Sequence, residues 1–395
     1  MSSRHASDGA RRGIAPWIIV TVVTALVVVA AVVGYVVIVR GGDDQAAASC
    51  SSEVILPVVA SPGSSAAVVA AASAFDATKP VARSACVTTA VTTLPGPEAE
   101  QALAGGWTAR SSPAPAVWVP DSENDLTALE TSNSALTAGR DPNPLATSPV
   151  VLAVRTGNAA AMSAGDLSWK SLPTATGPTG SLVLPSGGHL VLALPAPADN
   201  RATSYALQSV VAATSGAPVT AAKVTAATPQ LTALAAGGPV PQPALTQDAL
   251  TSLAAGSGGF TAVPVVQSDL TTFTAGTPGL TGVSPSGPTV GDAVFAVPVT
   301  AAWVTPTLDQ AAALFISYLR GAGGAAAFTA SGMQLTGPSP AGAASSAGPP
   351  SSPAGSPVGT AAGTPAPAPT ESALSDAGPT IDTALGQAVG AKPTG

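Results

Sequence analysis

Between residues 50 and 336, short apolar runs alternate with segments whose apolar residues recur at helical spacing. Residues 54–60 (VILPVVA) form one such run, and a turn-forming stretch at 61–64 separates it from the Ala- and Val-rich residues 66–75. Short apolar or β-branched runs bounded by turn residues indicate strands, whereas apolar positions repeating every three to four residues indicate helices. The alternation predicts an α/β domain with mainly parallel strand pairing.

The same pattern predicts further elements along the chain. Strands are predicted at residues 54–60, 86–92, 116–120, 149–154, 182–184, 190–194, 262–267 and 294–299. Helices are predicted at residues 66–75, 98–104, 126–130, 203–213, 245–254 and 308–320, and the last has the clearest amphipathic spacing. Two α/β units of this kind predict two lobes.

The apolar segment at residues 17–39 contains no charged residue. A helix over this segment would span about 35 Å at ~1.5 Å per residue, enough for a hydrocarbon core of ~30 Å. Several arginines lie in residues 1–16, whereas Arg40 alone follows the segment before two aspartates. The positive-inside rule therefore predicts a single-pass protein of the cell membrane, with residues 1–16 in the cytoplasm and the body outside.

Two alternatives to a retained anchor stay open. A cleaved signal peptide has an apolar region of ~7–15 residues followed closely by small residues; here the run is longer, and Ala46-Ala47-Ala48 lies well beyond it. Lipidation at Cys50 would need a large aliphatic residue just before the cysteine, and none is present. All three hypotheses leave the body outside the cytoplasm, behind a short tether at residues 40–49.

The end of the chain has a different composition. Residues 338–395 are rich in Pro, Ser, Ala and Gly, and most of this stretch lacks periodic apolar positions. Such a segment buries too little surface to offset its ordering entropy. We therefore predict a disordered tail over 338–395, with a weak helix near residues 380–389.

The composition of the chain limits the functions and partners that it can have. The chain is 46% hydrophobic but only 9% charged, with a net charge of −7. Lys and Arg form no cluster beyond the N-terminus, so a nucleic-acid partner is not expected. The abundance of Ala, Val, Gly and Pro with few lysines is typical of a high-GC bacterial genome.

The sequence offers little for catalysis. Its two histidines are His5, on the cytoplasmic side of the predicted anchor, and His189, in a Gly-rich loop. No nucleophile elbow, zinc-protease, C-x-x-C or P-loop motif occurs. We therefore expect no enzyme activity, no cofactor and no metal site.

Two cysteines, Cys50 and Cys86, both fall in the external part of the chain. An oxidising compartment allows them to pair in a disulfide, which would tie the start of the folded domain to its second strand. Two buried, unpaired thiols are the alternative.

Candidate ligand contacts follow from the positions of strand ends. Ligands of open α/β sheets bind at the carboxyl ends of strands, where helix N-termini offer unpaired N–H groups. Seven residues stand at such positions or at a predicted lobe crossing: Ser61, Gly63, Ser64, Asp121, Ser122, Thr147 and Ser148.

Each group of candidates also has a purely structural interpretation. Ser61 and Ser64 suit a helix N-terminus. Asp121 and Ser122 would serve equally well as a cap for the helix at 126–130. Thr147 and Ser148 fit hinge geometry before a proline.

Three blocks of the sequence resemble bacterial extracellular solute-binding proteins of the type II periplasmic-binding fold. They are residues 117–122 (VWVPDS), 145–154 (LATSPVVLAV) and 292–335. Within that family they look most like the actinobacterial membrane-anchored group that often carries a von Willebrand factor A domain, and the placement of the two cysteines also fits. Where an A domain would follow, this chain has only its Pro/Ser/Ala-rich tail, and no D-x-S-x-S motif supplies a metal site.

The resemblance implies a bilobal domain over residues 50–337. Lobe one would comprise about 50–146 and 290–337, and lobe two about 147–289, with the final predicted helix packing back on lobe one. The implied function is capture of a small ligand between the lobes, for uptake or sensing. An ABC-type permease or another envelope protein is the partner this function implies. The alternative is a non-catalytic scaffold or interaction module of the cell envelope that keeps the fold without a ligand.

Overall fold

The computed structural model describes residues 50–108, 110, 112–141, 143–164, 167–197, 200–336, 374 and 376–390. The predicted cytoplasmic segment, transmembrane helix and tether lie outside these described residues. Within the described ranges, no single helix has the length and hydropathy to cross a membrane; only Pro306–Arg320 and Ala322–Ala330 meet that test jointly, and they are bent by 61° at their junction.

Lobe one is built on a five-stranded sheet whose centre is parallel. The strand β1 (Ser52–Ala60) lies between β3 (Ala85–Thr93) and β4 (Val117–Val119), and both pairings are parallel. Two short edge strands, β2 (Val81–Ala82) and β9 (Val297–Pro298), pair antiparallel with β3 and β4. The parallel pairing expected from the sequence is present at the centre of this sheet.

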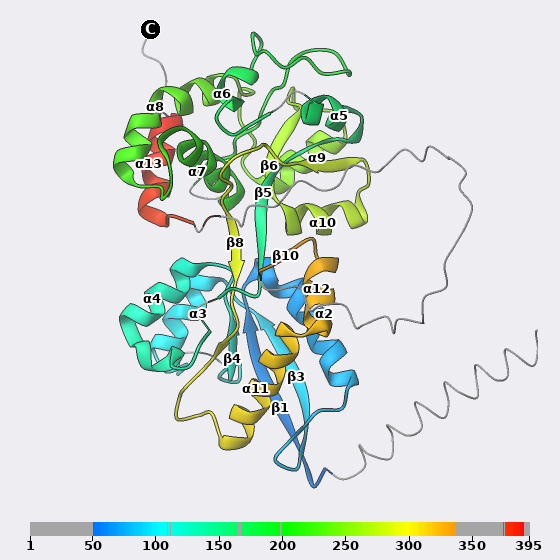
Figure 1. The fold of residues 1–395 in the computed structure, drawn as a ribbon, viewed down its shortest axis with the longest axis vertical. Coiled ribbons are helices and arrows are strands. Elements are labelled where there is room, and N and C mark those ends of the chain that lie inside the picture. Colours follow the sequence, from blue (N-terminus) through cyan, green and yellow to red (C-terminus); the bar gives the residue numbers. More distant parts are fainter. Residues whose placement is uncertain are drawn as a thin grey trace, which may run out of the picture.

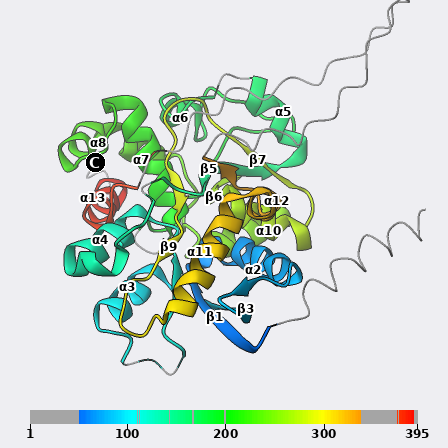
Figure 2. The same ribbon diagram turned by 60° about the horizontal axis from the view of Figure 1, so that its bottom comes forward.

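Helices cover both faces of that sheet (Figure 2). One face is covered by α2 (Pro62–Ala77), α11 (Pro306–Arg320) and α12 (Ala322–Ala330), and the other by α3 (Gly96–Ala104) and α4 (Glu123–Asn133). A short 3₁₀ helix, Ser134–Thr137, follows α4.

Alternation along β1 explains this two-sided packing. Leu56, Val58 and Ala60 pack with the cluster that includes α2 and α11, whereas Val59 packs with α3 and α4. Successive side chains of a strand point to opposite faces, so a central strand must be apolar on both. The predicted helix 308–320 packs on lobe one as expected, with Phe315 fully buried there.

The two cysteines are bonded to each other. Cys50 lies two residues before the start of β1, Cys86 lies in β3, and the structure joins them in a disulfide. Because β1 and β3 are paired with Glu53 opposite Cys86, the bond links the two strands at their N-terminal ends. The predicted disulfide is confirmed.

One long strand, β5 (Ala146–Arg155), belongs to both halves of the molecule. Its first residues pair with β8 (Gly291–Val294) and β10 (Gln334–Leu335), and its later residues pair with β6 (Ala262–Val266) and β7 (Leu280–Val283). Figure 1 shows β5 and β8 running between the two lobes. The predicted two-lobe α/β fold is therefore confirmed.

Pairing in lobe two differs from the sequence-based expectation. All four partners of β5 run antiparallel to it. The prediction of mainly parallel pairing thus holds only in lobe one. The chain leaves lobe one along β5 and returns along β8, so these two strands run in opposite directions. Alternating strand and helix signals in the sequence do not distinguish parallel from antiparallel pairing in such a case.

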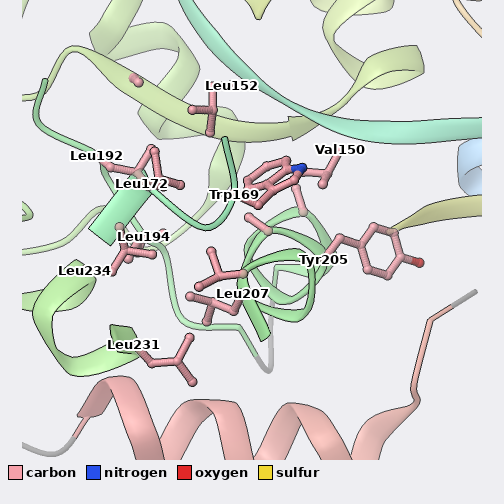
Figure 3. Packing of buried hydrophobic residues seen from close by; sticks show 14 of the residues in the cluster. Val150, Leu152, Trp169, Leu172, Leu192, Leu194, Tyr205, Leu207, Leu231 and Leu234 are labelled. Carbon is pink, nitrogen blue, oxygen red and sulfur yellow. The ribbon is translucent and has the colours of Figure 1, made fainter. Parts of the chain in front are cut away.

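The helices of lobe two surround this sheet. They are α5 (Thr156–Ala164), α6 (Leu172–Ala175), α7 (Arg201–Ser215), α8 (Ala221–Ala236), α9 (Thr246–Ala254) and α10 (Gln267–Gly276). Their shared core centres on Trp169, packed among Val150, Leu152 and Leu207 (Figure 3).

Two predicted strands in this lobe are wrong. Residues 182–184 and 190–194 make only isolated bridges, including Val183 with His189 and Leu192 with Ala262. Leu184, Leu190, Leu192 and Leu194 are nevertheless buried in the core. The apolar runs therefore predicted buried positions correctly. The Pro- and Gly-rich residues between them prevent a regular ladder of strand-to-strand hydrogen bonds.

The C-terminal part of the chain contains one more helix, α13 (Pro379–Gly390). It coincides with the weak helix expected near residues 380–389, and it packs against α8 and α7 of lobe two (Figure 1). The prediction of disorder does not hold for this segment. Residues 338–373, 375 and 391–395, to which that prediction also applies, lie outside the described residues.

Candidate ligand-binding cleft

The carboxyl ends of β1 and β4 bring two predicted site residues together. The backbone is still extended at Ser61, and α2 starts at Pro62, a favoured first helical residue. The Gly63 N–H donates to Asp121 Oδ2 at 2.8 Å. Parallel strands end at the same edge of a sheet, which is why Asp121 reaches the N-terminus of the neighbouring helix.

A cation from the other lobe meets the same carboxylate. Arg201 is the first residue of α7, and its Nη1 lies 3.1 Å from Asp121 Oδ2 and 3.2 Å from Asp292 Oδ2. Its Nη2 lies 3.0 Å from Asp269 Oδ2. Arg201 therefore joins lobe one, the crossing strand β8 and helix α10 of lobe two through charge-assisted contacts. We call these four residues the arginine bridge.

The position of Arg201 explains why it has three acidic partners. A cation in the first turn of a helix opposes the positive end of the helix dipole. Burial alone would lower the pKa of Arg201, but Asp292, Asp269 and Asp121 together raise it. The guanidinium thus stays charged.

Asp292 is the most enclosed member of the arginine bridge. It is 1% exposed, and its backbone pairs with Ser148 across the two crossing strands. Burial raises the pKa of Asp292 to about 8, while the Arg201 charge acts in the opposite direction. Burial therefore favours the protonated form of this carboxyl, against the effect of the neighbouring guanidinium.

Two cavities flank the arginine bridge. One of about 750 Å³ lies between Gly63, at the start of α2, and Phe273 of α10. Another of about 760 Å³ is lined by Asp121, Arg201 and Asp125. The two share Pro62, Asn200, Thr246 and Asp269, so they are adjoining parts of one cleft between the lobes.

The second cavity is strongly acidic. Among its described lining residues, one arginine, Arg201, faces five aspartates: Asp121, Asp125, Asp269, Asp376 and Asp382. Burial raises the pKa of Asp125 to about 7, and the charges of Asp121, Glu100 and Asp376 act in the same direction. Burial also raises the pKa of Asp382. Carboxyls so placed lower their repulsion by taking up a proton or by meeting a cation.

The other predicted residues at strand ends lie close by but have structural partners. Ser122 Oγ accepts from the Asn124 N–H at 3.2 Å and caps α4, while Ser122 also lines the acidic cavity. Ser64 Oγ lies 3.1 Å from the carbonyl oxygens of Ser61 and Val119. Ser61 is fully buried, and its Oγ has no hydrogen-bond partner among the described residues.

The two candidates at the lobe crossing are buried in β5. Thr147 is 4% exposed and Ser148 is fully buried. Ser148 Oγ accepts from the Ser268 N–H at 2.9 Å and so satisfies a donor in the first turn of α10. Neither residue lines the two cavities.

Sequence reasoning missed Arg201, Asp269 and Asp292. They lie far apart along the chain, and no motif links them to Asp121. One signal was available: in a chain with 9% charged residues, an arginine at the start of a largely apolar helix is unusual enough to mark a site.

Comparison with known proteins agrees with this architecture. A family model described as bacterial extracellular solute-binding protein matches residues 56–334. The fold is similar to that of the sulfate-binding protein SubI from Mycobacterium tuberculosis H37Rv, with a TM-score of 0.51, 16% identity, and coverage of 72% of this chain and 88% of that one. It is also similar to a substrate-binding domain assigned to a molybdenum ABC transporter of Clostridium difficile, with a TM-score of 0.50, 14% identity, and coverage of 73% and 100%. No curated protein sequence matches the chain.

Proposed function

Since the chain belongs to the family of bacterial extracellular solute-binding proteins, we propose that it captures a small solute in the cleft between its lobes, outside the cytoplasm, for uptake or sensing. The observation that carries this proposal is the pair of adjoining cavities, about 750 and 760 Å³, each lined by residues of both lobes. Cavities of this size hold a small organic molecule. A solute held there would contact both lobes and favour the closed arrangement.

The charges of the cleft favour a small organic cation. Helix N-termini usually attract anions, but here the Gly63 N–H already binds the Asp121 carboxylate. Arg201 likewise already lies within ion-pair distance of Asp121, Asp269 and Asp292. An added anion would meet the aspartates of the second cavity, whereas an ammonium or guanidinium group would be attracted by them. The names of the two similar structures contain sulfate and molybdenum. For the reason just given, we do not propose either as the solute of this protein.

The same proposal includes a retained membrane anchor. The uncharged segment 17–39 and the arginines before it support a single-pass helix with residues 1–16 in the cytoplasm, and residues 40–49 would tether the body to the membrane. This arrangement keeps the binding domain near an ABC-type permease or another envelope partner. It also matches the actinobacterial membrane-anchored group that the sequence resembles. In this role the protein binds its solute without chemical conversion.

One observation favours a second candidate, a scaffold of the cell envelope that keeps the fold without a ligand. The chain's own Asp121 occupies the Gly63 N–H, and its own carboxylates neutralise Arg201. The groups most suited to hold an anionic solute are thus satisfied internally. In this alternative the cleft is a fixed contact between lobes.

A thermal-shift series on the full-length protein in detergent distinguishes these candidates. The probes are putrescine and arginine as organic cations, sulfate and molybdate as anions, and glucose as a neutral solute. A bound probe at 100 times its Kd stabilises the fold by about 2.7 kcal/mol. We expect stabilisation by a cation, weakened in Asp125→Asn and unchanged in Asp309→Asn, whose carboxylate is exposed on α11 of lobe one. Stabilisation by an anion alone would contradict the proposed ligand class, and no shift with any probe would favour the scaffold.

A further inference from the structure

The described C-terminal residues, 374 and 376–390, contact three separate parts of the molecule. The first contact is with the segment that leads into the crossing strand β8. The Leu374 N–H donates to the Thr289 carbonyl at 2.7 Å, and the Gly291 N–H donates to the Leu374 carbonyl at 3.3 Å. Leu374 therefore adds a strand-like pairing next to the point where the chain crosses between the lobes.

The second contact is with lobe one. Asn124 of α4 donates from Nδ2 to Asp376 Oδ2 at 3.0 Å and to the Asp376 carbonyl at 3.2 Å. Asp376 makes this contact with α4 of lobe one although α13, which begins three residues later, packs on lobe two. Asp376 thus joins the C-terminal segment by hydrogen bonds to α4, a helix of lobe one that would move away from lobe two if the cleft opened.

The third contact is with a polar stripe on α7 of lobe two. Gln208 is fully buried, donates to Asp376 and accepts from the Ala377 N–H at 2.9 Å. One turn earlier, Ser204 donates to Asp382. Buried polar side chains are costly unless they find partners, and in this helix the C-terminal segment supplies them.

Apolar packing anchors the segment firmly on lobe two. Ile381, Leu385 and Ala388 of α13 are buried in the main core of that lobe. Figure 3 shows Leu231 of α8 projecting toward α13. The segment therefore has an extensive apolar attachment to lobe two and a small polar attachment to Asn124 of lobe one.

We propose that residues 374 and 376–390 form an inter-lobe strap, which is anchored in lobe two, is joined to lobe one by the hydrogen bonds between Asn124 and Asp376 (the polar hook), and restrains opening of the cleft. The strap also contributes Asp376 and Asp382 to the acidic cavity. This inference rests on the proposed function in one respect: restraint of the cleft matters for a solute that must enter it. When the lobes separate, the polar hook breaks first, because α13 stays embedded in lobe two.

The distance between the lobes tests the strap without any ligand. Spin labels placed by Thr127→Cys on α4 and Thr225→Cys on α8 occupy exposed positions in different lobes. In the full-length protein, Asn124→Ala removes only the hook. The loss of two hydrogen bonds between the lobes should raise the population of molecules with an open cleft roughly five- to tenfold. Double electron–electron resonance would detect this as longer distances between the two spin labels.

Two further variants keep the experiment decisive. Asn143→Ala is the matched control, since Asn143 is exposed and its side chain donates to Asp141 in its own loop. Ending the chain after residue 373 removes the whole strap and should open the cleft further; should that variant fail to fold, Asn124→Ala decides alone. Identical distances in Asn124→Ala and in the control would overturn the strap. Because no solute is added, failure of every thermal-shift probe would count against the proposed ligand and leave the strap standing.

Discussion

Lobe one and lobe two share a layered α/β architecture but differ in strand direction and in the segments of sequence that build their cores. In lobe one, β1 has parallel neighbours on both sides and apolar residues on both faces, so its core is built largely from contiguous α/β units plus α11. In lobe two, β5 pairs antiparallel with β6 and β7, and the core is completed by α13, more than a hundred residues beyond β6 along the chain. Lobe two thus depends on segments far apart in sequence, and the site residues that were missed lie in or next to it.

The largest expected effect tests the core of lobe one. Phe315 is fully buried and its ring packs edge-on against Phe75 at 5.2 Å. Phe315→Ala should lower the free energy of unfolding by about 3–5 kcal/mol, through lost burial and a residual cavity. The measurement is chemical denaturation followed by circular dichroism.

The neighbouring residue supplies the control for this substitution. Leu314 lies on the same helix but is 36% exposed. Leu314→Ala should cost clearly less than Phe315→Ala. Equal losses would contradict the assigned packing of α11 on lobe one.

The second prediction asks whether α13 is a true part of lobe two. Leu385 is fully buried against the core. Leu385→Ala should destabilise the protein by about 2–4 kcal/mol in the same denaturation experiment. Gln387, exposed on the same helix, is the control, and Gln387→Ala should change stability by less than about 0.5 kcal/mol. A Leu385→Ala protein as stable as that control would show that the C-terminal helix is dispensable.

The third prediction concerns the arginine bridge, where the lobes meet. Arg201→Gln leaves Asp121, Asp269 and Asp292 without their cation and should cost about 2 kcal/mol near pH 9. The loss should shrink toward pH 6, because without Arg201 the pKa of Asp292 rises further above its present value of about 8 and the carboxyl takes up a proton. Stability is measured by denaturation at several pH values.

A surface pair provides the comparison for that variant. Arg110 pairs with Glu98 at 2.9 Å, and the Glu98 side chain is 55% exposed. Arg110→Gln should change stability little at any pH, as is usual for exposed ion pairs. A pH-independent loss in Arg201→Gln would mean that Asp292 does not respond to Arg201.

The smallest effect is expected at Asp125, on the lobe-one side of the acidic cavity. Burial raises the pKa of Asp125 to about 7 in the folded protein, from an ordinary value of 3.8, so the folded state binds the proton more tightly than the unfolded state does. Its contribution to stability is complete below pH 4 and is lost as the pH rises through about 7. Asp125→Asn should therefore be more stable than the parent by about 1–2 kcal/mol at pH 8, and show little gain at pH 4.

The control for this last variant is Asp309→Asn on α11, far from the cleft. It should show no such pH-dependent gain, because Asp309 is exposed. A gain in Asp125→Asn that is the same at pH 4 and pH 8 would argue against the raised pKa and would point to a packing effect instead.

Sequence patterns predicted lobe one better than lobe two for a physical reason. Residues 54–60, 86–92 and 116–120 were predicted as strands from apolar and β-branched runs, and each overlaps a strand in the structure. In lobe two, the buried leucines between 182 and 194 gave the same local signal but form loops. Whether an apolar run joins a ladder depends on a partner strand, and the partner is not visible in local spacing.

The sequence by itself determined the α/β character, the apolar core positions and the strand ends where Gly63 and Asp121 meet, because periodicity and turn residues act over a few neighbouring positions. Only the tertiary structure decided that Arg201 meets Asp121, Asp269 and Asp292, and that α13 completes lobe two. Those contacts join segments separated by tens to hundreds of residues. They depend on how β5 and β8 orient the two lobes. The residues next to a charged side chain in the sequence do not indicate which distant residue will become its partner.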